Sequence, residues 1–342
     1  MYAEARHSAV ERMLLKGTSV EDRAVLRSVT VAVPATTANL GPGFDCLGLT
    51  LDLWNEVTVS LEGVGVRISV EGEGAGRLPE DESNPIAAGA LALLAEHGVL
   101  PQGLAIECRN AVPPASGLGS SATAAIAASV AANTLLGGPL TRHDIMLRAV
   151  HQEGHPDNVA AALFGGLVLV AQDDGEAESD APSGAGRFIV RRFDLPRLDV
   201  AVVVPDHRST TRAARAKVPR QVSLEDAVFN IGRTALVIDA LRTGDLELLR
   251  SAMDDRLHQG VRMASIPGAT AALRAGREAG AAAVALSGSG PSLIAFAGSP
   301  GDAGAAGAAI VAAFGEAGAT ARAFILGTTN RPARLEALQP LG

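Results

Sequence analysis

The segment Pro113–Ala122, with the sequence PPASGLGSSA, constrains the fold of this chain more than any other. Its glycines allow the backbone to approach a ligand closely, and the hydroxyls of Ser120 and Ser121 can bind phosphate oxygens or a metal ion. Residues 123–136 are mostly small or apolar and predict a buried helix. A Gly-Ser loop at a helix start predicts an anion site, because the first N–H groups are unpaired and the dipole is positive there. The alternative is an ordinary turn before a core helix.

The composition limits the class of protein. A chain of 342 residues exceeds one typical domain, so we expect two. The apolar fraction of 47% and the charged fraction of 19% are typical of a packed globular protein. Aromatic residues make up only 3% and the net charge is −8, so the chain lacks both aromatic platforms for bases and a basic face for phosphates. We expect no nucleic-acid partner.

The cysteines and the N-terminal residues indicate a cellular location. Cys46 and Cys108 supply neither a disulfide framework nor the spacing of a zinc site, which is typical of the reducing cytoplasm. Residues 1–27 form a mixed-charge extension without the long apolar stretch of a secretion signal. No apolar run predicts a membrane span. We expect a cytoplasmic protein with no membrane partner.

Periodic apolar patterns predict strands and helices in a mixed order, which indicates an α+β fold with helices on one side of antiparallel sheets. The acidic segment 172–186 lies between two strand patterns, so a hairpin loop explains it better than a domain linker. We expect the extension over residues 1–27, one domain over 28–195 and a second over 196–342. The predicted strands are 28–33, 55–61, 65–71, 103–109, 165–171, 198–204, 282–287, 293–297 and 320–326. The predicted helices are 84–97, 123–136, 141–152, 209–217, 224–241, 246–257 and 303–314, with one more helix before residue 282.

Three glycine-rich segments, at residues 34–48, 113–122 and 286–296, resemble the three signature segments of the GHMP small-molecule kinases. The resemblance extends from about residue 28 to residue 326. It implies a two-domain GHMP kinase fold, with an N-terminal βα domain that carries the phosphate loop and a C-terminal ferredoxin-like α/β sandwich. It also implies that the turn at 287–292 packs against the phosphate loop and supports it.

Within that family, the first segment and the segment EGHPDN at 153–158 are most similar to members that phosphorylate L-homoserine. The resemblance implies that Asp45 binds the substrate ammonium group, and that Arg215 and Arg262 hold its α-carboxylate, which suits the planar guanidinium. Here Gly260 and Val261 replace a Pro-Tyr-like pair of the family pattern. The alternatives are that Asp45 caps a turn and that Arg215, like Arg212 and Arg220, is an ordinary solvated helix charge.

The same resemblance implies the remaining roles. Glu153 and Ser120 would bind Mg²⁺, for which oxygen ligands are suited, and Asn84 would contact adenine unless it only caps a helix. The residues expected to act in catalysis are Asn39, Ser121, Glu153 and Asn158. The residues expected to bind substrate are Asn39, Asp45, His155, Asn158, Arg215 and Arg262. The residues expected to hold ATP are Asn84, Pro113, Pro114, Ala115, Ser116, Gly117, Leu118, Gly119, Ser120, Ser121 and Ala122.

The activity that the resemblance implies is ATP- and Mg²⁺-dependent phosphorylation of the L-homoserine hydroxyl to O-phospho-L-homoserine, a step of threonine biosynthesis, by a homodimer. No lysine accompanies the Gly-Ser loop and no general base is evident, so we expect catalysis by positioning. Two alternatives stay open: a kinase of the same family for a mevalonate-like or sugar substrate, and a sensor that binds ATP and a metabolite without turnover.

Overall fold

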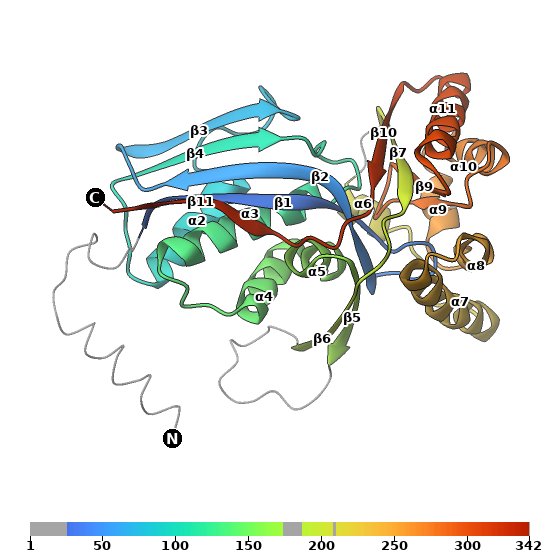
Figure 1. Ribbon diagram of the computed structural model, residues 1–342, viewed down its shortest axis with the longest axis horizontal. Coiled ribbons are helices and arrows are strands. Elements are labelled where there is room, and N and C mark those ends of the chain that lie inside the picture. The colour runs from blue at the N-terminus through green and yellow to red at the C-terminus, as the bar shows by residue number, and fades with distance from the viewer. Residues whose placement is uncertain (1–25, 174–186, 208–209, 342) are drawn as a thin grey trace.

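The computed structural model describes residues 26–173, 187–207 and 210–341, and it contains two β-sheets with their helices (Figure 1). The first sheet has seven strands in the order β11-β1-β2-β4-β3, with β5 paired to β2 and β6 to β5. Only β3 and β4 pair in parallel. Its strands are β1 (Leu26–Ala38), β2 (Leu47–Ser60), β3 (Gly65–Gly72), β4 (Gly103–Asn110), β5 (Leu167–Asp173), β6 (Arg187–Phe193) and β11 (Arg334–Pro340).

Four helices cover one face of this sheet (Figure 1). The central one, α3, is rich in alanine, and its small side chains allow it to lie closely beneath β1. Asn84 caps α2, and Thr141 forms a capping box at the start of α4, so both helices begin where the sequence predicts. The helices are α2 (Pro85–Glu96), α3 (Ser120–Leu135), α4 (Arg142–Glu153) and α5 (Asp157–Phe164).

The second sheet has four antiparallel strands in the order β10-β7-β9-β8. With a helical connection after β7 and α11 between β9 and β10, this is the ferredoxin-like arrangement that the resemblance implies. Its elements are β7 (Asp199–Pro205), α6 (Thr211–Arg215), α7 (Leu224–Thr243), α8 (Leu246–Ala252), α9 (Gln259–Met263), α10 (Ala269–Glu278), β8 (Ala283–Leu286), β9 (Leu293–Ala297), α11 (Pro300–Glu316) and β10 (Ala321–Gly327).

The two sheets share a hydrophobic core. One face of the second sheet packs on α10 and α11. Its other face, with α7 and α8, joins a cluster that includes side chains of β2 and Leu118 of the phosphate loop. The loops that connect the two halves are therefore fixed by buried apolar contacts, and the candidate site lies among these loops.

The sequence-based prediction was correct for most elements, but it gave no bounds for β6 and α10. It missed β11, an edge strand with almost no buried side chain, and the short helices α5 and α9. It also extended α8 too far, because that helix ends at Ala252. Strands β5 and β6 pair antiparallel with Asp173 opposite Arg187, so they form the expected hairpin.

Some expectations fall outside the described residues: most of the extension at 1–27, residues 174–186 of the proposed hairpin loop and residue 209 of one predicted helix. The domain division at 195 and 196 stays a prediction, and β11 lies in the first sheet, although 196–342 would place it with the second. In the part of the chain that the structure describes, no helix is long and apolar enough to cross a membrane.

The turn at 287–292 lies against the phosphate loop, which confirms its expected supporting role. The hydroxyl of Ser287 donates to Gly117 O at 2.8 Å, and that of Ser292 donates to Ser116 O at 2.5 Å. The backbone of Gly288 donates to Ala38 O at 3.1 Å. The three glycine-rich segments are thus joined directly.

We expect the variant Ser292→Ala to lose about 1–3 kcal/mol of unfolding free energy, because the buried Ser116 carbonyl then loses a hydrogen-bond donor. Chemical denaturation would measure this loss. The exposed Ser83 provides the control, since Ser83→Ala should stay within about 0.5 kcal/mol of wild type. Equal effects of the two variants would contradict the supporting role.

Candidate functional site

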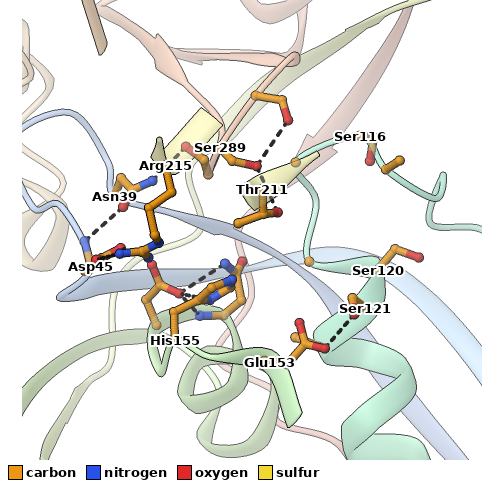
Figure 2. Close-up of a pocket in the computed structure, with 18 of the residues that line it drawn as sticks. Asn39, Asp45, Ser116, Ser120, Ser121, Glu153, His155, Thr211, Arg215 and Ser289 are labelled. Atoms are coloured by element: carbon orange, nitrogen blue, oxygen red, sulfur yellow. Dashed lines mark hydrogen bonds and ion pairs between the residues drawn. The ribbon is translucent and has the colours of Figure 1, made fainter. Parts of the chain in front are cut away.

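Most of the predicted site residues line one cavity at the junction of the two sheets (Figure 2). They come from the turn after β1, the phosphate loop, the segment between α4 and α5, helices α6 and α9, and the turn after β8. The lining residues are Asn39, Asp45, Ala115, Ser116, Gly117, Gly119, Ser120, Ser121, Ala122, Glu153, His155, Asp157, Asn158, Thr211, Arg215, Arg262, Gly288, Ser289 and Gly290.

The N-terminal end of α3 has the features of an anion site. Helix α3 begins at Ser120 after Gly119, with no side-chain cap and no acidic residue in the first turn. Its first intrahelical bond runs from Thr123 N to Gly119 O, so the earlier N–H groups have no partner within the helix. The hydroxyls of Ser120 and Ser121 lie at the same helix end. This end can therefore receive phosphate oxygens.

The glycines of the loop are required by packing within the protein. Gly117 and Gly119 both have positive φ, +82° and +68°. A Cβ atom at Gly119 would collide with Thr36 Oγ1, and one at Gly117 would collide with the Ser287 carbonyl. These glycines are therefore needed for contacts within the protein, in addition to the close approach to a ligand that the sequence predicts.

The residues that the sequence predicts to hold ATP do not all line the same cavity. Leu118 is fully buried in the shared core and does not line the cavity. Asn84 is buried: its side-chain oxygen accepts from Ile86 N at 2.9 Å and its amide nitrogen donates to Pro79 O at 2.7 Å. Helix capping is thus confirmed for Asn84, and a contact with adenine stays a prediction. Pro114 and Asn84 line a neighbouring, mostly apolar cavity.

The hydroxyl of Ser121 donates to Glu153 Oε1 at 2.5 Å (Figure 2). The serine that the structure pairs with Glu153 is therefore Ser121, whereas the sequence favoured Ser120 as its partner in metal binding. Among the described residues, no group of three or more His, Cys, Asp or Glu side chains could hold a metal ion. Carboxylate and hydroxyl oxygens still suit Mg²⁺, which usually keeps waters and binds substrate phosphates as well.

Asp45 and Arg215 form a bidentate ion pair at the cavity (Figure 2). Nη1 and Nη2 of Arg215 lie 2.6 Å and 2.8 Å from the two carboxylate oxygens of Asp45. This pair joins α6 of the second half to the turn after β1, and its hydrogen bond raises the pKa of Arg215. The two side chains predicted to bind opposite ends of a substrate are thus adjacent, and each is engaged by the other.

Arg262 is only 2% exposed, and in the described part of the chain it forms no salt bridge. Its Nη1 lies 3.2 Å from His258 Nδ1 and 3.3 Å from Gly288 O, and its Nε has no hydrogen-bond partner. Burial lowers the pKa of this guanidinium. A buried cation without a counterion is costly, so an incoming carboxylate would stabilise it. The substitution at Gly260 and Val261 does not remove Arg262 from the cavity.

Asn39 and Asn158 are held by internal hydrogen bonds. Asn39, with a φ of 69°, donates to Gly288 O at 2.7 Å and accepts from Asp45 N at 3.0 Å. The Oδ1 atom of Asn158 accepts from Thr36 Oγ1 at 2.8 Å. Both asparagines therefore fix the loops that carry the charged residues, although both also line the cavity.

Sequence reasoning missed Asp157, which is 2% exposed and lines the cavity. Its Oδ1 lies 3.1 Å from His155 Nδ1 and accepts from Asn158 N at 2.7 Å. The hydrogen bond from Asp157 raises the pKa of His155, partly opposed by burial. Thr211 and Ser289 were also missed; their hydroxyls lie 3.4 Å apart at the cavity. Asp157 lies within the EGHPDN segment at 153–158 that the sequence analysis had singled out. Its position in that segment was the signal that could have identified it as a site residue.

Comparison with known proteins agrees with this geometry. Models of the GHMP kinase N-terminal and C-terminal domains match residues 84–166 and 237–317. A homoserine kinase of Moorella thermoacetica is 47% identical over 267 residues, covering 78% of this chain and 86% of the relative. One of Trichormus variabilis is 41% identical over 310 residues, covering 89% and 98%.

Solved structures show the same relation. The homoserine kinase of Cytophaga hutchinsonii superposes with a TM-score of 0.77 at 31% identity and covers 94% of this chain and 100% of its own. A mevalonate kinase of L. major shares the fold, with a TM-score of 0.63 at 20% identity. Fold and site thus define an ATP-dependent phosphotransferase of the GHMP kinase class. Within that class, the chain belongs to the homoserine kinase family.

We expect Gly119→Ala to lower the unfolding free energy by about 1–3 kcal/mol, because the new Cβ meets Thr36 in a left-handed backbone conformation. It should also weaken ATP binding, measured by calorimetry. The control is Gly304→Ala in α11, where no atom lies within 4 Å of the new Cβ. That variant should lose no stability and should gain up to about 1 kcal/mol. Unchanged stability of Gly119→Ala would contradict the packing explanation.

Proposed function

We propose that this protein transfers the γ-phosphate of ATP to the hydroxyl of L-homoserine, giving O-phospho-L-homoserine in threonine biosynthesis. The observation that carries the proposal is the buried guanidinium of Arg262, which lines the cavity without a carboxylate partner among the described residues. Asp45 lines the same cavity and supplies the opposite charge. One cavity thus offers a cation for an α-carboxylate and an anion for an α-ammonium group.

The Asp45–Arg215 ion pair is compatible with substrate binding. Each carboxylate oxygen of Asp45 accepts one N–H from Arg215 and keeps a further lone pair for an ammonium group. The free Nε of Arg262 and the unused N–H groups of Arg215 can donate to a carboxylate. A zwitterionic substrate could therefore bind while the Asp45–Arg215 ion pair stays intact. A sugar has neither charge, and a mevalonate-like acid has no ammonium group for Asp45.

ATP is proposed to place its phosphates at the N-terminal end of α3, where unpaired N–H groups and two serine hydroxyls meet. Glu153 and the adjacent serine hydroxyls supply the hard oxygen ligands that suit Mg²⁺. When bound, the metal ion would neutralise charge on the transferring phosphoryl group. Ser121 would then give up its hydrogen bond to Glu153 and contact the metal ion and the phosphates instead.

Positioning is the proposed source of catalysis. Lys16 and Lys217 are the only lysines; Lys217 does not line the cavity, and Lys16 lies outside the described residues. The charge of the γ-phosphate would then be met by the amides and dipole of α3, by the hydroxyl of Ser120 or Ser121 and by Mg²⁺ when it is bound. A loose phosphoryl-transfer transition state needs little activation of the nucleophile. The substrate hydroxyl therefore loses its proton late, to the phosphate or to water.

Two other functions have less support. A kinase for mevalonate-like or sugar substrates would leave Asp45 without a role, and a non-catalytic sensor would not need the Ser121–Glu153 pair. The homodimer, the cytoplasmic location and a domain boundary near residue 195 stay predictions. A coupled assay of ADP release with homoserine, mevalonate and galactose tests the proposal. Homoserine should be the best substrate, and a clear preference for another substrate would overturn the proposal.

We expect Asp45→Asn to lower kcat/KM for L-homoserine by about 10- to 100-fold, the effect of losing a hydrogen bond to a charged group. For 4-hydroxybutanoate, which lacks the amino group, the same variant should differ much less from wild type. Steady-state kinetics with both substrates measure this difference. A loss of equal size for both would mean that Asp45 only maintains the loop through Arg215.

We expect Glu153→Gln to lower kcat by about a hundredfold or more, since the variant keeps the volume but removes the anionic ligand. L-Homoserine should still bind, as calorimetry can show. Glu247→Gln, at an exposed glutamate paired with Arg250, is the matched control and should keep wild-type activity. Near wild-type activity of Glu153→Gln, with an unchanged Mg²⁺ requirement, would assign Glu153 a structural role.

A further inference from the structure

His258 links the two charged sides of the substrate cavity without lining it. It lies directly before α9, is fully buried and has no role in the sequence-based site beyond preceding Arg262. Its ring nitrogens contact two different segments. Nε2 lies 2.8 Å from Gly41 O, in the turn that carries Asp45, and Nδ1 lies 3.2 Å from Nη1 of Arg262.

These two contacts fix the protonation state of the ring. A carbonyl oxygen can only accept and a guanidinium can only donate. Nε2 of His258 must therefore carry the proton and donate to Gly41, and Nδ1 must accept from Arg262. The imidazole is neutral in this arrangement. The other tautomer breaks both bonds, and the protonated form breaks the bond from Arg262.

The ring is also held in place from other directions. Its own backbone N–H donates to Asp255 Oδ2 at 2.8 Å, and the N–H of Gln259 donates to the same oxygen at 2.7 Å. The ring stacks on Phe44, with centroids 5.0 Å apart and an angle of 29° between the planes. Phe44 precedes Asp45, so this stacking again connects α9 to the loop of the opposite half.

Three charged groups face the imidazole from the surrounding elements: Asp255 before α9, Arg262 within it and Asp45 on the loop. Burial lowers the pKa of His258 below its ordinary value of 6.5; Arg262 lowers it further, whereas Asp255 and Asp45 oppose this. Protonation would place an N–H against the Nη1 group of Arg262 and add a second buried positive charge. Arg262 would then lose one of the two acceptors of its guanidinium and keep the Gly288 carbonyl.

We propose that His258 is a positioning residue, whose neutral imidazole holds Arg262 in place for the substrate carboxylate and ties it to the loop that carries Asp45. His258 then sets the separation of the cationic and anionic sides together with the Gly288 carbonyl, to which both Arg262 and Asn39 donate. This inference rests on the proposed function, because the position of Arg262 matters only if the cavity takes an amino-acid carboxylate. ATP binds at α3, so its affinity should not depend on His258.

Two variants test the proposal. His258→Leu removes both ring hydrogen bonds with an apolar side chain. His258→Gln keeps a donor for Gly41 and an acceptor for Arg262 but does not titrate. We expect the KM for L-homoserine to rise about tenfold or more in His258→Leu, the size of a lost hydrogen bond to a charged group, with the KM for ATP unchanged. His258→Gln should recover most of this loss.

The pH dependence supplies a readout that a purely structural role would not change. In the wild type, the KM for L-homoserine should rise only on the acid side of the ordinary imidazole pKa of about 6.5, because burial lowers the pKa of His258 and only the protonated ring stops accepting from Arg262. His258→Gln should lack this part of the rise, and comparing the two removes the titration of ATP and of other groups. If His258→Leu does not fold, the comparison of the wild type with His258→Gln alone decides whether His258 positions Arg262.

A wild-type KM in a folded His258→Leu variant, or the same acid-side rise in His258→Gln, would overturn the positioning role. Equal increases in the KM for ATP and for homoserine would overturn it as well, since they indicate general loosening of the site. A wild-type protein that does not phosphorylate homoserine would instead overturn the proposed function. The two failures are therefore distinguishable.

Discussion

The contact of three glycine-rich segments at the junction of the two sheets is the constraint on which the rest of the structure depends. The turn at 287–292 donates hydrogen bonds to the carbonyls of Ser116 and Gly117 and to that of Ala38. Side chains at Gly117 or Gly119 would push these segments apart. Because the segments cannot separate without breaking buried hydrogen bonds, the loop before α3 and the loop that carries Asp45 keep a fixed position relative to one another.

Because these segments are joined, the carboxylate of Asp45 and the guanidinium groups of Arg215 and Arg262 line the same cavity. The ion pair of Asp45 and Arg215 is partly exposed, so its own contribution to stability is small. Arg262 is different, because it is buried and, among the described residues, its guanidinium hydrogen-bonds only to a neutral imidazole and a carbonyl and lies over the Phe44 ring. The folded protein therefore stabilises this guanidinium incompletely, and a substrate carboxylate would supply the missing interaction.

The sequence predicted much of this arrangement from local chemistry. The uncapped start of α3, which stays a candidate anion site, followed from the glycines and serines before an apolar helix, and the caps at Asn84 and Thr141 followed from residue type. Strand β11 was missed because an exposed edge strand carries almost no apolar alternation. The pairing of Asp45 with Arg215, and the link from His258 to Gly41, join residues far apart in the chain, so no local pattern could predict either.

The most direct test of the central claim is a crystal structure of the protein with L-homoserine bound. We predict that the α-carboxylate lies within hydrogen-bond distance of the Arg262 guanidinium, and that the ammonium group lies within hydrogen-bond distance of an Asp45 carboxylate oxygen. The hydroxyl should point toward the N-terminal end of α3. A bound substrate that leaves Arg262 in contact only with His258 and Gly288 would contradict the claim that this buried guanidinium recognises the amino acid.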